Sequence, residues 1–283
     1  MQPTRSRRGP RPGALPDLDR EFERARRARL RGAVAGVTAL VLVLGLGGAV
    51  AWSLRPGAEP PRGTSAAGRP GHGGDTRVEE EPSDPPLVKP KRTPYIPAKG
   101  TGKFHRPASS GKVHGHGKLM RYMVEVEGGL KQSPEAFARS VDGILADPRG
   151  WTAGGRLAFE RVDSGAYDFV VKLASPGTVD TICGAYGMTT EGKVNCSAGK
   201  QVVVNLKRWL LLTTYYRGQP EHYHALTINH EVGHRLGFGH MTCPGRGRLA
   251  PVMQQQIFGL KGCRINGWPY DRKGRFVKGP SVP

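Results

Sequence analysis

The stretch that decides the fold is His230-Glu231-Val232-Gly233-His234-Arg235-Leu236-Gly237-Phe238-Gly239-His240, which reads HExxHxxGxxH. Two histidines four residues apart on a helix project from the same face, so both imidazoles can reach one zinc ion at about 2.0–2.1 Å. Glu231 is rotated by about 100° around the axis, where it misses the metal and reaches a water bound to it. Gly237 can stop the helix and let His240 supply a third nitrogen. Three protein ligands leave a fourth position for water, which is typical of a catalytic zinc.

This pattern is specific, because five fixed positions at about one in twenty each make a chance match rare. The alternative is a surface helix with solvated histidines. The motif resembles the metzincin clan of zinc peptidases. That resemblance implies a methionine turn beneath the metal, and Met253 in Pro251-Val252-Met253 follows His240 at a suitable distance. Some metzincins carry a tyrosine two residues after this methionine, a place that Gln255 holds here.

A longer stretch, from Asn229 to Gln256, is similar to a bacterial family of membrane-anchored or secreted proteins catalogued as a domain of unknown function. The runs that carry this resemblance are Asn229 to His234, Cys243-Pro244-Gly245 and Ala250 to Gln256, and Asp147-Pro148-Arg149-Gly150-Trp151 also fits it. The resemblance covers about residues 119–270. It implies a zinc peptidase fold and no particular substrate.

The N-terminal region predicts a membrane protein. Residues 1–31 hold ten Arg against four acids, which favours a cytoplasmic tail by the positive-inside rule. Residues 32–54 carry no charge, and a helix of this length would be roughly 35 Å long, enough to cross a membrane. We expect a single-pass anchor with the catalytic part outside the cell. A cleaved signal peptide, and hence a secreted protein, is the alternative, because Ala49-Val50-Ala51 resembles a cleavage site.

Residues 55–118 are rich in Pro and Gly and poor in large apolar side chains, so we expect a disordered linker. The formal net charge of the chain is +20, and a charge this positive can indicate binding to nucleic acid. A location outside the membrane makes that partner unsuitable, and anionic cell-envelope polymers fit the charge of the linker better. We expect the folded part to be a monomer.

Residues 119–275 read as one α/β (α+β) domain with a twisted mixed sheet, an active-site helix and a loop-rich C-terminal part, followed by a tail at 276–283. Met120–Val126 alternates like a strand, and Ser133-Pro134 begins a helix with an apolar stripe. Strands are expected at 157–162, 167–174 and 201–206, with a short helix from 176 to 183. The zinc helix is expected from about 220 to 236. One hypothesis from this order is that 201–206 is the edge strand of the cleft, in which case an extended peptide could pair with it.

Four cysteines, all after residue 180, allow three connectivities. The local pairs Cys183–Cys196 and Cys243–Cys263 are favoured, because each closes a loop and the compartment is oxidising. A cysteine zinc site is the rival, but no CxxC spacing occurs. Since Cys243 lies three residues after His240, its bond would also hold the loop of the third ligand.

The sequence therefore predicts a zinc-dependent endopeptidase that acts outside the membrane. His230, His234 and His240 hold Zn²⁺, and Glu231 acts as general base toward a zinc-bound water. The substrate is a peptide or protein. One alternative is a non-catalytic cell-envelope binding module with a structural metal, which would have no use for Glu231. Another is a hydrolase of wall peptides.

Overall fold

A computed structural model describes residues 86–282, and the folded domain begins earlier than the sequence indicates. Residues 86–118 were expected to end a disordered linker. Instead they form an arm that adds the short strands β1 (Phe104–His105) and β2 (His114–Gly115) to the sheet. Backbone pairing and hydrogen bonds to buried carboxylates hold this arm on the domain. Neither interaction can be predicted from amino-acid composition, which is poor in apolar residues here. The predicted tail 1–31, membrane span 32–54 and linker residues 55–85 lie outside the described residues.

A seven-stranded mixed sheet forms the centre, in the order β2-β4-β3-β5-β7-β6, with β1 pairing with β3. The strands β3 (Lys118–Glu127), β4 (Leu157–Arg161), β5 (Phe169–Ala174) and β7 (Gln201–Asn205) run parallel. The edge strand β6 (Cys196–Ala198) is antiparallel to β7. The α/β class with a mixed sheet is confirmed. The expectation that 201–206 is the edge strand is wrong, because β7 pairs on both sides.

Helices cover both faces of the sheet. Val202 and Val204 of β7 pack into the larger core with α2 (Pro134–Ala146) and α5 (Pro220–Arg235). Val203 points the other way, into a smaller core with α3 (Pro176–Gly184). Such a strand is apolar on both faces, as buried parallel strands are. The remaining helical segments are η1 (Trp151–Gly154), α4 (Leu206–Leu211) and η2 (Thr214–Tyr216).

The positions of α2 and α5 agree with the helix signals in the sequence. The Ser133 hydroxyl accepts from the Ala136 N–H at 3.2 Å, and Pro134 takes the first helical position. The predicted stripe of Phe137, Val141, Ile144 and Leu145 is buried. In α5 the row of Ile228, Val232 and Leu236 is buried as expected.

The strand predicted from the alternation is present as β3, and its two glutamates are buried rather than open to water. Glu125 and Glu127 are 5% and 1% exposed. Glu127 accepts from the Gly102 N–H and the Thr178 hydroxyl, at 2.8 and 2.6 Å. Glu125 pairs with Arg106 and Lys172. The arm therefore covers this face, and its polar partners make the burial of two carboxylates tolerable.

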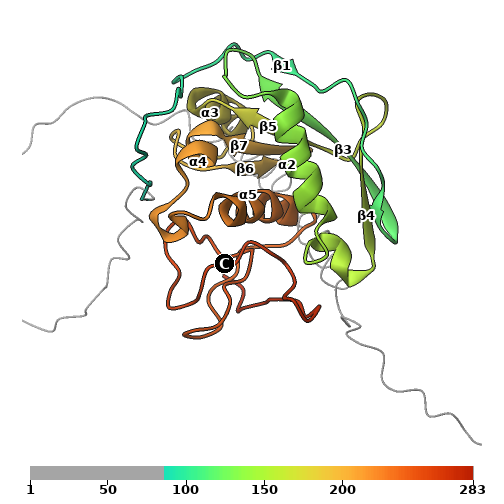
Figure 1. The fold of residues 1–283 in the computed structure, drawn as a ribbon, viewed down its shortest axis with the longest axis vertical. Helices are drawn as coiled ribbons and strands as arrows, with labels where there is room; N and C mark the ends of the chain where they lie inside the picture. Colours follow the sequence, from blue (N-terminus) through green and yellow to red (C-terminus); the bar gives the residue numbers. More distant parts are fainter. Residues whose placement is uncertain (1–85, 283) are drawn as a thin grey trace, which may run out of the picture. The chain divides into compact units, whose positions relative to one another are not determined.

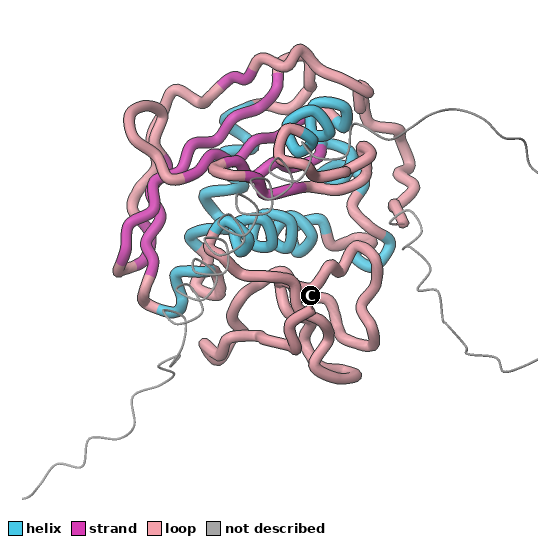
Figure 2. Tube along the Cα trace, turned by 180° about the vertical axis from the view of Figure 1, so that it is seen from behind, coloured by secondary structure: helices cyan, strands magenta, loops and turns pink. Residues whose placement is uncertain are grey.

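The helix α5 lies between the sheet and the loop-rich C-terminal part (Figures 1 and 2). Residues after Leu236 form loops with isolated bridges rather than long elements, as predicted. The residues expected as a free tail pair in part with the chain after α5, where Met241 bridges Ser281 in antiparallel fashion. No helix within residues 86–282 is long and apolar enough to cross a membrane.

Candidate metal centre

The three histidines of the motif converge. The Nε2 atom of His234 lies 3.1 Å from the Nε2 atom of His230 and 3.1 Å from that of His240. All three residues are partly buried. Among the described residues, this is the group of His, Cys, Asp and Glu side chains that could hold a metal ion.

The opposite nitrogens of two of these rings show which tautomer is present. The Nδ1 atom of His230 lies 2.8 Å from the Val252 carbonyl oxygen, and that of His234 lies 2.9 Å from the Phe238 carbonyl oxygen. A carbonyl can only accept, so each Nδ1 carries the hydrogen and, in the neutral ring, each Nε2 presents a lone pair. Burial, and then the charge of His234, lower the pKa of His230 to about 3, and burial lowers that of His240. The rings of His230 and His240 are therefore neutral near pH 7.

The lone pairs of His230 and His234 therefore face one another at 3.1 Å, and they repel unless a cation lies between them. Nitrogens bound to zinc at about 2.0–2.1 Å in a tetrahedron lie roughly 3.3 Å apart, close to the observed separation. A set of three imidazoles suits zinc and other late transition metals rather than calcium or magnesium, which prefer oxygen. The residues present fit a zinc ion held by His230, His234 and His240.

Glu231 follows the first of these histidines and is 6% exposed. Burial raises the pKa of its carboxyl group to about 8. A divalent cation held by the neighbouring imidazoles would oppose this shift, because it favours the charged carboxylate. A carboxylate in so dry a place interacts more strongly with protons and charges than one in water does. Glu231 is therefore a buried titratable group one residue after the first of the converging histidines.

The end of α5 turns the chain toward the third histidine. The Phe238 N–H donates to the Gly233 carbonyl and the Gly237 N–H to the His234 carbonyl, both at 3.0 Å. This pair of bonds is a Schellman motif, which needs a left-handed residue after the helix. Gly237 takes that place with φ +97°, as predicted. The same turn presents the Phe238 carbonyl to His234.

The predicted methionine turn lies against the histidine helix. Met253 is 0% exposed, and its sulfur lies so close to Gly233 that a Cβ there would clash with it. Its carbonyl accepts from the Met241 N–H at 3.1 Å, next to His240. With Val252 bonded to His230, the turn contacts the segments of two candidate ligands. The exposed Gln255 side chain follows it.

Sequence reasoning missed the residues that hold α5 from the side. The Trp151 indole N–H donates to the Asn229 carbonyl at 3.0 Å, and its ring stacks on Phe238 with centroids 4.7 Å apart. The Asn229 side chain donates to the Gly267 carbonyl at 2.9 Å. Trp151 is 78 residues from Asn229, and no spacing rule relates positions so far apart. The only signal was the resemblance that included Trp151.

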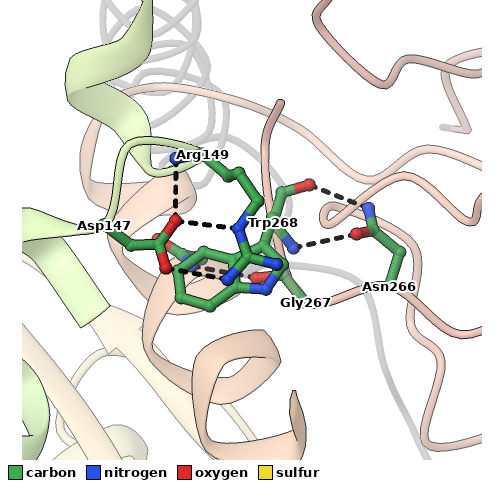
Figure 3. Close-up of polar contacts among 6 residues, drawn as sticks. Asp147, Arg149, Asn266, Gly267 and Trp268 are labelled. Atoms are coloured by element: carbon green, nitrogen blue, oxygen red, sulfur yellow. Dashed lines mark hydrogen bonds and ion pairs between the residues drawn. The ribbon is translucent and has the colours of Figure 1, made fainter. Parts of the chain in front are cut away.

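An arginine clamp beside this contact joins the loop after α2 to the C-terminal part (Figure 3). The Arg149 guanidinium donates to both oxygens of Asp147, at 2.9 and 2.8 Å, and lies 4.2 Å over the Trp268 ring. Burial alone would raise the pKa of Asp147, but the hydrogen bonds and charge of Arg149 lower it. The ion pair is therefore formed near neutral pH, and it keeps the guanidinium flat against the indole.

Both predicted disulfides are present. Cys183–Cys196 ties α3 to β6 on the face of the sheet away from α5. Cys243–Cys263 joins two loops that follow His240. The other histidines near the motif lie apart from the metal group: His224 stacks on Trp209 with centroids 3.6 Å apart, and His222 is exposed. The pair His114 and His116 in the arm is not part of the group either.

A family model with the description "Protein of unknown function (DUF3152)" matches residues 91–268. Its range runs from the arm to Trp268 and includes the three histidines, Glu231 and Met253. The searches of curated proteins and of solved structures found no match.

Proposed function

The chain belongs to the DUF3152 family, whose description names no activity, and from its metal centre we propose that it is a zinc-dependent endopeptidase. One observation carries the proposal: the Nε2 atom of His234 lies 3.1 Å from those of His230 and His240, while a buried carboxyl group follows the first of these histidines on the same helix. A structural zinc is closed by four protein ligands and needs no such acid. Three ligands plus Glu231 suit hydrolysis.

We assign the centre to the metzincin type on three features of this chain. The ligand spacing is HExxHxxGxxH, Gly237 makes the turn after the helix, and Met253 packs beneath the histidine helix. The assignment concerns the site, and it accounts for why the sulfur of Met253 and the ring of Trp151 lie so close to Gly233.

In the proposed reaction Glu231 accepts a proton from the attacking water and later gives it to the leaving amine. The helix α5 fixes this carboxyl group beside His230, so no rearrangement is needed between the two transfers. The carbonyls of Val252 and Phe238 orient the rings of His230 and His234 and make their Nε2 atoms better donors to a metal. A zinc ion held by the three histidines would supply Lewis acidity, which lowers the pKa of water toward 7 and polarises the scissile carbonyl.

We further propose that the domain works outside the cytoplasmic membrane. Its two disulfides are typical of oxidising compartments. The uncharged stretch 32–54 would supply the anchor in this proposal, with the basic residues 1–31 on the cytoplasmic side.

The test uses the full chain, with zinc quantified and cleavage measured on a peptide library and on wall-peptide fragments. Glu231→Gln should keep zinc and lose at least about a hundredfold in cleavage rate, because a general base contributes about 10²–10⁴. Glu221→Gln, on an exposed acid in the first turn of the same helix, is the matched control and should cleave normally.

Equal cleavage by wild type and Glu231→Gln would remove the catalytic role. Tight zinc without cleavage of any peptide or wall fragment would favour the binding module. Cleavage confined to wall fragments would make the protein a wall-peptide hydrolase that uses the same chemistry.

A further inference from the structure

Apart from the arm, the excess positive charge of the folded part lies in its C-terminal portion. Residues 119–231 hold twelve Lys and Arg against twelve Asp and Glu. Residues 232–283 hold nine Lys and Arg against a single acid, Asp271, which already pairs with Arg275 at 2.8 Å. The uncompensated charge is therefore concentrated on the chain that follows Glu231.

Four of these cations stand on two linked loops, residues 243–249 and 260–264, which we name the cationic loop pair. The Cys243–Cys263 disulfide joins the loops. The Gly247 N–H donates to the Gly262 carbonyl and the Arg264 N–H to the Arg248 carbonyl, both at 2.8 Å. The four cationic side chains are all exposed: Arg246, Arg248, Lys261 and Arg264. Since no acid occurs between Glu231 and Asp271, neither loop carries a carboxylate that would neutralise them.

The base of the cationic loop pair is attached to the metal centre. The Ala250 N–H donates to the Arg264 carbonyl at 2.9 Å, and two residues later the Val252 carbonyl holds His230. The first loop begins three residues after His240. The C-terminal loops lie on the side of α5 opposite the sheet (Figure 2), and Val252, which bonds to His230, belongs to these loops. A polypeptide bound at the three Nε2 atoms would extend several residues on each side, at about 3.3 Å per residue. A substrate chain that runs along these loops would bring its charges within the screening length of about 8–10 Å.

We infer that the cationic loop pair docks acidic stretches of the polypeptide substrate, so that the enzyme prefers peptides with Asp or Glu near the scissile bond. This inference rests on the proposed function and names its substrate class. Several positive charges held on loops that a disulfide and hydrogen bonds link together speed the encounter with an acidic peptide. They disfavour the binding of basic peptides. A polypeptide is favoured over an anionic polymer, because the backbone that carries the cations also carries the turn that orients His230.

The binding test separates docking from cleavage. Full-length protein carrying Glu231→Gln is titrated into fluorescent peptides of equal length that are acidic, neutral or basic, at about 50 and about 300 mM salt, which changes the screening length severalfold. We expect the acidic peptide to bind roughly tenfold more tightly than the neutral one at low salt, and the advantage to shrink at high salt. Arg246→Glu combined with Arg248→Glu should remove the advantage.

The matched control is Lys131→Glu combined with Arg139→Glu, which makes the same charge change at exposed positions before and on α2. It should leave the acidic preference intact, and thermal unfolding checks that both double variants are folded. An equal loss in this control would overturn the inference, because net charge rather than the loop pair would then explain binding. Equal binding of acidic and neutral peptides, or tighter binding of a phosphodiester polymer than of the acidic peptide, would also overturn it.

Cleavage by the wild-type chain distinguishes this inference from the proposed function. If neutral and acidic peptides are cleaved with equal kcat/KM, the proposed peptidase activity is supported and the proposed docking surface is refuted. If acidic peptides bind through the cationic loop pair and none is cleaved, the docking surface is supported and the proposed peptidase activity is refuted.

Discussion

The backbone N–H of Val282 donates a hydrogen bond of 3.1 Å to the carbonyl oxygen of His240, the last of the three converging histidines. The Thr242 N–H donates to the Pro280 carbonyl at 2.8 Å, so residues 279–282 form a short antiparallel brace on this segment. Gly279 fits closely, because a Cβ there would overlap the Thr242 carbonyl and lie 3.0 Å from Pro251. The brace lies beyond the part of the chain that the family model matches.

A chain that ends at Lys278 should bind zinc about ten- to a hundredfold more weakly, which is the usual cost of losing support around a metal ligand. His230 and His234 keep their own carbonyl partners, so the loss is partial. Competition with a chromophoric chelator measures the affinity. Ser281→Ala keeps both backbone bonds and should bind zinc like wild type. Unchanged affinity of the shortened chain would show that His240 needs no brace.

Gly233→Ala should destabilise the fold by about 1–3 kcal/mol, because the added methyl group meets the sulfur of Met253 and lies 2.8 Å from the Trp151 ring. Gly143→Ala is the matched control: Gly143 is exposed in α2 with no atom within 4 Å of its new methyl group. That change should stabilise the fold by about 0.5–1 kcal/mol. Denaturant unfolding of both variants checks the pair, and a neutral Gly233→Ala would mean that Met253 moves aside freely.

Local sequence signals predicted most of the elements and the convergence of the three histidines, because each depends on residues close in the chain. General rules of helices and their ends predict three of these features: the spacing of His230 and His234, the glycine that ends α5, and the proline that begins α2. The two disulfides were predictable for the same reason, since they close loops with separations of 13 and 20 residues.

The support of the site could not be predicted in this way. The Val252 carbonyl that orients His230 is a backbone atom, and any residue type at position 252 would supply it. The partners of Trp151 and Glu127 come from distant segments, and only the tertiary fold brings them together. The same holds for the arm: strand pairing and the buried carboxylates of β3 hold it on the domain, and both depend on residues far apart in the chain.

The Cys243–Cys263 bond should matter for zinc, whereas the Cys183–Cys196 bond should not. Cys263→Ser frees the loop that starts three residues after His240, and we expect both lower stability and several-fold weaker zinc binding. Cys196→Ser, on the other face of the sheet, is the control and should lower stability alone. Loops of this size gain roughly 3 kcal/mol from closure in the chain-entropy view. Equal zinc affinity in both variants would limit the bond to a stabilising role.

The Glu125 carboxylate predicts how the arm responds to acid. Burial alone would raise its pKa, but hydrogen bonds from Lys172 and Arg106, and then their charges, lower it below its ordinary value of 4.5. Because the folded pKa lies below the unfolded one, the folded state binds fewer protons, and stability falls as pH drops below about 4.5. Above that pH the full contribution is present.

Glu125→Gln should therefore cost about 1–3 kcal/mol at pH 7, as the loss of hydrogen bonds to a charged group does, and progressively less below pH 4.5. Arg106 belongs to the arm, so proteolysis between residues 86 and 118 should quicken in the variant at pH 7. Glu191→Gln, on a more exposed ion pair with Lys193, serves as the control and should change neither quantity. A gap between wild type and Glu125→Gln that stays constant down to pH 3 would show that the Glu125 carboxylate does not hold the arm by its charge.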